Sequence, residues 1–126
     1  MSLKTLKSWF VVHFLVDILI AIPLFFVPEY FLSILGWNSI DPLMSRLVAS
    51  ALFGIGGISL IARNSSKETF KILLNLKIIW SLCAITGFAI SILSSDYPDI
   101  VWLFLLLFVI FSFNWIYHRI RIEKYV

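Results

Sequence analysis

Two ionisable side chains, His13 and Asp17, lie four residues apart in the first apolar stretch of the chain. In an α-helix this spacing places them on one face, where the imidazole and the carboxyl could share a proton or bind a ligand together. Asp17 lies roughly 13 Å into a hydrocarbon core that is about 30 Å thick, and ionisable groups at that depth commonly mark function. The alternative is structural, because polar side chains in membrane spans also join helices, at about 0.6 kcal/mol per hydrogen bond.

The direction of helical side chains selects the expected neighbours of this pair. A side chain leans toward the N-terminus of its helix, so a polar residue on an antiparallel helix leans toward the depth of His13 and Asp17. We therefore predict a polar cluster that contains His13, Asp17 and Asn114, with Asn75 or Lys77 nearby. Lys77 leans the other way and can extend its amine to the membrane surface instead.

Neither a metal ion nor an organic cofactor is predicted at this site. His13 and Asp17 supply two ligands, whereas metal sites in proteins take three or four converging ligands. The other histidine, His118, falls at the end of an apolar stretch, and Cys83 lies alone in another one. The sequence also contains no recognisable nucleophile–base pair, phosphate-binding glycine loop or zinc-protease motif, so no catalytic residue is predicted.

Four apolar stretches position these residues, and each has about the 20 residues that a bilayer crossing needs. Hydrophobic residues make up 61% and charged residues 13% of the 126 residues, against about 45–50% and 25% in soluble domains. This composition excludes a soluble globular enzyme, and the single cysteine excludes an internal disulfide. We predict an all-α, integral membrane four-helix bundle that forms one transmembrane domain over residues 1–126. Its expected spans are residues 8–27, 42–62, 70–93 and 100–118.

The basic residues predict the orientation of the spans. All of the ten lysines and arginines except Arg46 fall on one side of the predicted membrane, and the side richer in basic residues is the cytoplasmic one. We therefore expect cytoplasmic N- and C-termini, a location in the cytoplasmic or plasma membrane, and a first apolar stretch that is a retained helix and not a signal peptide. This topology and contact with anionic lipid explain the net charge of +3, so nucleic acid is not an expected partner.

Capping and proline signals predict where the helices begin. Asp41 followed by Pro42 is typical of an N-cap and first helical residue, and Ser65 with Glu68 is typical of a capping box. Pro98 is expected to start the last helix in the same way. Pro23 lies inside the first span, where it removes a backbone hydrogen bond and should kink the helix. A short helix over residues 28–36 could lie in the membrane interface.

The second and fourth spans carry opposite packing signals. Ser50, Gly54 and Gly57 form a small-residue face on the second span, where two backbones could approach closely, either inside the bundle or between protein copies. Aromatic residues point all around the fourth span, so it faces either lipid or another protein. A cation–π contact between Lys77 and Trp80 is a further possibility on the third span.

About a third of the chain resembles the DoxX-like class of small four-helix membrane proteins. The resemblance lies in the proline after the first span, in the Leu-Gly-Trp turn at 35–37, and in Asp41-Pro42 and Arg46-Leu47 before a glycine-rich second span. It implies four helices and a helper role, since some members are similar to accessory subunits of membrane oxidoreductases. It transfers no catalytic residue to this chain.

Two functional hypotheses follow from the sequence. The first is a non-catalytic accessory or scaffold subunit that packs against other integral membrane subunits and against membrane lipids. The second is a small transporter or binding protein for a proton, a cation or a lipophilic molecule, which uses His13 and Asp17 and acts as a homo-oligomer. A lipid-modifying or redox enzyme that uses Cys83 or His13 is a weaker third hypothesis.

Overall fold

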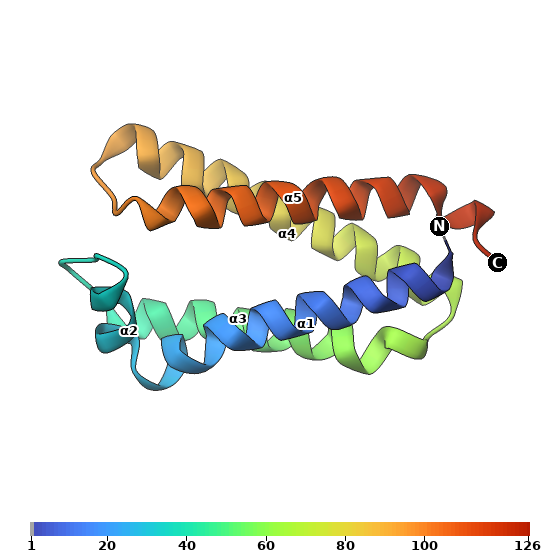
Figure 1. The fold of residues 1–126 in the computed structure, drawn as a ribbon, viewed down its shortest axis with the longest axis horizontal. Coiled ribbons are helices and arrows are strands. Elements are labelled where there is room, and N and C mark those ends of the chain that lie inside the picture. The colour runs from blue at the N-terminus through green and yellow to red at the C-terminus, as the bar shows by residue number, and fades with distance from the viewer. Residues whose placement is uncertain (1) are drawn as a thin grey trace. The chain divides into compact units, whose positions relative to one another are not determined.

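The computed structural model describes residues 2–126, which form helices joined by short connections (Figure 1). No strand occurs among these residues. The α-helices are α1 (Leu3–Phe26), α2 (Pro28–Ile34), α3 (Pro42–Ile61), α4 (Lys67–Ser94) and α5 (Ile100–Arg121), and two short 3₁₀ helices are η1 (Ala62–Asn64) and η2 (Ile122–Lys124).

Four of the helical segments are long and apolar enough to cross a membrane. They are Leu3–Phe26, Pro42–Asn64, Lys67–Ser94 and Ile100–Lys124. Three of them contain a predicted span whole, and Leu3–Phe26 contains all of the predicted span 8–27 except Val27. Each segment also extends beyond its predicted span at one end or both, into turns that carry polar residues. The all-α fold class and the four candidate membrane-spanning helices are thereby confirmed.

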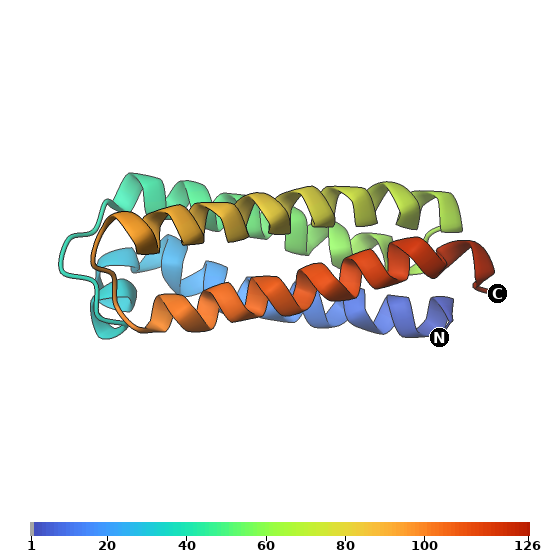
Figure 2. The same cartoon turned by 90° about the horizontal axis from the view of Figure 1, so that it is seen from above.

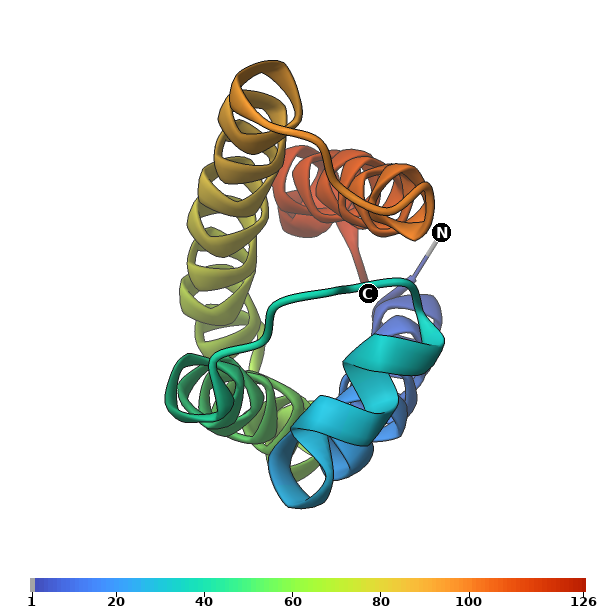
Figure 3. The ribbon, with the colours of Figure 1, turned by 90° about the vertical axis from the view of Figure 1, so that its left-hand side faces the viewer.

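The chain divides into two compact units, of which one comprises residues 4–65 and the other contains residues 66–126. In the first unit α1 and α3 run in opposite directions, and α2 lies across the end of α1 (Figures 1 and 3). The helix α2 falls within residues 28–36, where the sequence suggested a short helix. Its C-terminus turns at Gly36, whose φ of 106° lies in the left-handed region that favours glycine.

Backbone hydrogen bonds around Gly36 form a Schellman motif. The N–H of Trp37 donates to the Leu32 carbonyl at 3.0 Å, and the N–H of Gly36 donates to the Ser33 carbonyl at 3.1 Å. These two bonds satisfy carbonyls at the end of α2 that have no partner within the helix. The motif therefore ends α2 and directs the chain toward the start of α3.

The N-cap of α3 is the predicted one, whereas that of α4 is not. Asp41 Oδ1 accepts from the Leu43 N–H at 2.9 Å and the Met44 N–H at 3.3 Å, and Pro42 is the first helical residue. For α4, the cap is Ser66, whose Oγ accepts from the Thr69 N–H at 3.3 Å. The prediction of a Ser65–Glu68 capping box is wrong by one residue, because Ser65 follows η1 directly and closes its turn with a bond to the Ala62 carbonyl.

Prolines act differently at the ends of α1 and α5. The last helix begins at Ile100, two residues after Pro98, because the N–H groups of Val101 and Trp102 first close tight turns on the carbonyls three residues before them. The prediction that Pro98 is its first residue is therefore wrong. In α1, by contrast, the helix continues past Pro23 to Phe26.

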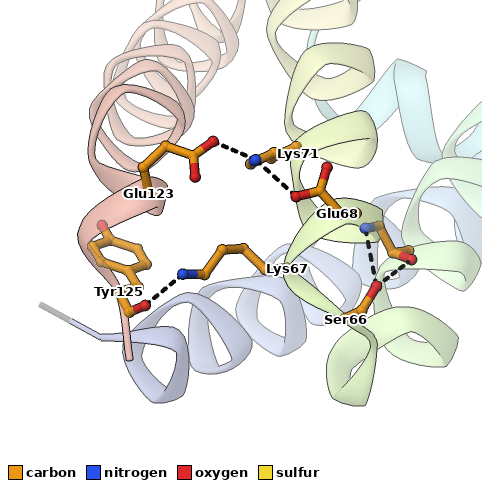
Figure 4. Close-up of polar contacts among 7 residues, drawn as sticks. Ser66, Lys67, Glu68, Lys71, Glu123 and Tyr125 are labelled. Atoms are coloured by element: carbon orange, nitrogen blue, oxygen red, sulfur yellow. Dashed lines mark hydrogen bonds and ion pairs between the residues drawn. The ribbon is translucent and has the colours of Figure 1, made fainter.

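In the second unit α4 and α5 form an antiparallel hairpin (Figure 2). Aromatic rings join the two helices, since Phe108 lies 5.5 Å from Phe88 and 6.3 Å from Trp80 between ring centroids. Trp115 and Ile122 are buried at the other end of the hairpin. The C-terminal segment after α5 folds back against the first turns of α4 (Figure 4).

Candidate functional site

His13 and Asp17 lie on one face of α1, as their spacing predicts. His13 Nε2 is 3.4 Å from Asp17 Oδ2, which is close enough for an ion pair when the imidazole is protonated. Both residues are only 5% exposed. A helical turn separates their backbones, so the regular geometry of α1 places the two groups within reach of each other. The pair is therefore a desolvated acid and base on a helix that can span a membrane.

The helix α3 approaches this pair at Gly56. A Cβ atom at residue 56 would lie 2.8 Å from Asp17 Cβ and 3.2 Å from Asp17 Oδ2. The nearby hydroxyl of the buried Ser59 donates to the Ile55 carbonyl of its own helix at 2.7 Å. The carboxyl of Asp17 thus faces His13 along α1 and the backbone of α3 at Gly56.

The predicted small-residue face of α3 is not the one that packs inside its unit. Ser50 is exposed and donates its hydroxyl to the Arg46 carbonyl at 2.8 Å, and a Cβ atom on Gly54 or Gly57 would meet nothing within 4 Å. The buried residues of α3 are Ala49, Leu52, Gly56 and Ser59. Their spacing of three, four and three residues marks a helical face, and that spacing is the signal that would have identified Gly56.

Lys77 is buried on α4, only 1% exposed, and its Nζ lies 4.9 Å from the centre of the Trp115 ring of α5. Two predictions are corrected by this contact. The amine does not extend to a surface, and the described cation–π contact is with Trp115, not with Trp80. The reason is that α5 packs antiparallel to α4 and brings a large ring to the level of the ammonium group, which the sequence of α4 alone does not encode.

The two asparagines of the second unit have different environments. Asn114 is half-buried on α5, and its buried Nδ2 has no hydrogen-bond partner among the described residues. Asn75 on α4 accepts a hydrogen bond from Arg119 Nε at 2.9 Å, which ties α4 to α5. The structure therefore brings together His13 and Asp17 in the first unit, whereas Lys77, Asn75 and Asn114 belong to the second. The polar cluster that combines the two sets stays a prediction.

A second polar group, which the sequence analysis did not identify, holds the C-terminus (Figure 4). Lys71 pairs with Glu68 at 2.8 Å and also with Glu123, and Lys67 Nζ donates to the Tyr125 carbonyl at 2.7 Å. The Tyr125 hydroxyl lies 2.6 Å from Nδ1 of the buried His118. The sequence signal for this contact is the opposite charge of Lys71 and Glu123, which are predicted to lie on the same side of the membrane.

Burial changes the acidity of Tyr125, which lies beyond the last membrane-spanning helix. Removal of its phenol from water raises the pKa above its ordinary value of 10.0, and the neighbouring Tyr117 acts in the same direction. The phenol is therefore neutral over the physiological range. In that form it fixes the tail against the end of α5 without burying a charge.

Neither a search for metal-binding side chains nor a comparison with known proteins assigns a function to this chain. Among residues 2–126, no group of three or more His, Cys, Asp or Glu side chains could hold a metal ion. The chain matches no protein-family model, no curated protein and no solved structure. The resemblance to the DoxX-like class is accordingly not confirmed, and any functional assignment depends on the geometry of the chain itself.

Proposed function

We propose that this chain is a non-catalytic integral membrane protein that binds a proton or a small cation at His13 and Asp17. One observation supports the proposal: the buried 3.4 Å contact between an imidazole and a carboxyl on the membrane-spanning α1. Histidine is the side chain whose charge changes near neutral pH, and a carboxyl beside it alters its affinity for a proton. In a low-dielectric environment this mutual effect is strong.

The contact between His13 and Asp17 differs in kind from a hydrogen bond between two helices. Interhelical hydrogen bonds stabilise a bundle because they join two helices. His13 and Asp17 contact each other along one helix, so the energy of this contact does not hold α1 to another helix. Burial of two ionisable groups is costly, and ionisable groups inside membrane spans commonly bind or exchange a charge.

Proton or cation flux into liposomes provides the test. The full-length protein would be reconstituted with a pH-sensitive dye inside, and Asp17→Asn and His13→Gln would be compared with the unmodified chain. We expect both variants to lose the ion-dependent signal at unchanged expression and helix content. Asp96→Asn, in the exposed loop before α5, is the matched control and should retain it. Unchanged flux or binding in Asp17→Asn would contradict the proposal.

A second candidate function is an accessory or scaffold subunit, as the sequence suggested first. It is favoured by α5, where Trp102 is 59% exposed and Phe113 is 71% exposed. Large aromatic side chains on a membrane-spanning helix fit either lipid or a protein partner. Gentle extraction followed by intact-complex mass spectrometry distinguishes these possibilities. Other integral membrane subunits in one assembly would favour the accessory role, and a homo-oligomer or monomer with lipid would favour the ion-binding role.

Orientation and membrane belong to the same proposal. We place both termini and the 63–69 connection in the cytoplasm and the chain in the cytoplasmic or plasma membrane, because basic residues concentrate on that side. A DoxX-like helper role agrees with the accessory candidate. Four short helices enclose little volume, and residues 2–126 contain four candidate membrane-spanning helices, so the ion-binding candidate would act as a dimer.

A further inference from the structure

Gly56 of α3 approaches Asp17 more closely than any other residue type would allow. A Cβ atom at residue 56 would lie 2.8 Å from Asp17 Cβ, a separation that real Cβ atoms essentially never show. The nearest atom is the Cβ of Asp17, which is fixed to the α1 backbone and cannot rotate away. Any larger residue at position 56 would therefore have to move α3 away from α1.

Gly56 also lies close to the Asp17 carboxyl oxygen that faces His13. Asp17 Oδ2 is 3.4 Å from His13 Nε2, and a Cβ atom at Gly56 would lie 3.2 Å from the same oxygen. From these contacts we infer that Gly56 is a positioning residue of the site. It lets the α3 backbone pack against Asp17 and thereby keeps the carboxyl beside His13. This inference rests on the proposed function, because it concerns the same pair.

Within the first unit, few other titratable side chains lie near the pair, so the titration of His13 should depend mainly on the position of the Asp17 carboxyl. The part of α3 that packs beside Asp17 carries no titratable side chain between Arg46 and Arg63. The buried neighbours of Gly56 on its own helix are Leu52 and Ser59. Along α1 and α2 the nearest titratable groups are Lys7 and Glu29. A displacement of the Asp17 carboxyl should therefore register in the titration of His13.

The experiment measures that titration by NMR in the full-length protein. The chain is placed in lipid nanodiscs with ¹⁵N-labelled histidine, and the signals of the two histidines are assigned with His13→Gln. Asp17→Asn should shift the midpoint of the His13 titration. Gly56→Ala should move the midpoint at least half of the way toward the Asp17→Asn value. Gly57→Ala is the matched control, since a Cβ there meets nothing within 4 Å, and it should keep the unmodified midpoint.

Each outcome separates the two proposals. If Asp17→Asn leaves the His13 midpoint in place, the proposed function fails, whatever the glycine variants do. If Asp17→Asn shifts it and Gly56→Ala behaves like Gly57→Ala, the positioning role of Gly56 is overturned and the proposed function stands. Should Gly56→Ala not fold, the double variant Asp17→Gly/Gly56→Ala is used. It removes the Cβ–Cβ clash and should recover folding, and failure to recover, with Asp17→Gly itself folded, also overturns the inference.

Discussion

Arg46 shows how a single residue can join two helices where the hydrophobic pattern predicts nothing. Its Nε donates to the Phe25 carbonyl at 3.0 Å, so the first turns of α3 are tied to the last turn of α1. Carbonyls in the last turn of a helix have no partner within it, and a cation there also interacts favourably with the helix dipole. Arg46 is also the basic residue that departs from the predicted charge asymmetry. The hydrogen bond to Phe25 gives a structural reason for a basic residue on the side that otherwise has none.

Replacement of Arg46 with methionine should therefore weaken the first unit. We expect the free energy of unfolding to fall by about 0.5–1.5 kcal/mol, the net contribution of a typical intramolecular hydrogen bond. Thermal unfolding in detergent, followed by circular dichroism, measures this change. Arg63→Met is the control, because the described hydrogen bond of the Arg63 side chain goes to the Leu60 carbonyl, three residues before it, and does not reach α1. Equal losses in the two variants would show that the link between α1 and α3 adds no stability.

Residue-level contacts across helices were the least predictable part of the site. The approach of His13 to Asp17 follows from helical spacing and was predicted, because both residues lie on one helix. The contact of Lys77 with Trp115 was not, since it depends on the register between α4 and α5. The small-residue face predicted on α3 contained Gly54 and Gly57 and not Gly56, because which glycine is buried depends on how α3 packs against α1. A run of small residues shows that close packing is possible, but the burial of neighbouring side chains decides which face packs.

At the scale of the element, the start of α4 provides a test of the capping assignment. The Ser66 hydroxyl accepts from the Thr69 N–H, whereas Ser65 makes its described bond through its backbone. Ser66→Ala should lower the free energy of unfolding by about 0.5–2 kcal/mol. Ser65→Ala should change it by less than about 0.5 kcal/mol. Thermal unfolding of the two variants distinguishes them, and a larger loss in Ser65→Ala would restore the capping box that the sequence suggested.

The C-terminal segment provides a prediction about pH. Because burial raises the pKa of Tyr125 above 10.0, the folded tail binds the phenol proton more tightly than the unfolded tail does. The stabilising contribution of the neutral phenol is complete below pH 10 and is lost as the pH rises through the raised pKa. A titration followed by ultraviolet absorbance should therefore contain a late step from the Tyr125 phenol. Tyr125→Phe should remove this late step and Tyr97→Phe should leave it. A late step that survives in Tyr125→Phe would contradict the assignment.

At the scale of the whole molecule, hydrophobicity determined most of what could be predicted. Stretches such as residues 103–110 are continuously apolar, which in a chain of this composition requires helices that satisfy their own backbone hydrogen bonds in lipid. The number and type of long helices follow from that constraint. The start of a helix is predicted correctly where an N-cap residue and a proline agree, as at Asp41 and Pro42. The prediction is wrong at Pro98, where backbone hydrogen bonds form a turn before α5 begins.

The orientation of the chain in its membrane is the remaining property of the whole molecule that the sequence predicts. Cys83 is the single cysteine, so Cys83→Ser gives a background without reactive thiols. On this background, Ser65→Cys marks the connection between α3 and α4, and Ser95→Cys marks the one between α4 and α5. The arginine and lysine residues around Ser65 predict that it is cytoplasmic, and the acidic residues after Ser95 predict that it lies on the opposite side. A membrane-impermeant maleimide should therefore label Ser95→Cys in intact cells and Ser65→Cys only after the membrane is opened. Labelling in the reverse order would place the C-terminal cluster of Lys67, Lys71 and Glu123 outside the cell. Equal labelling of both would mean that α4 does not cross the membrane as a single span.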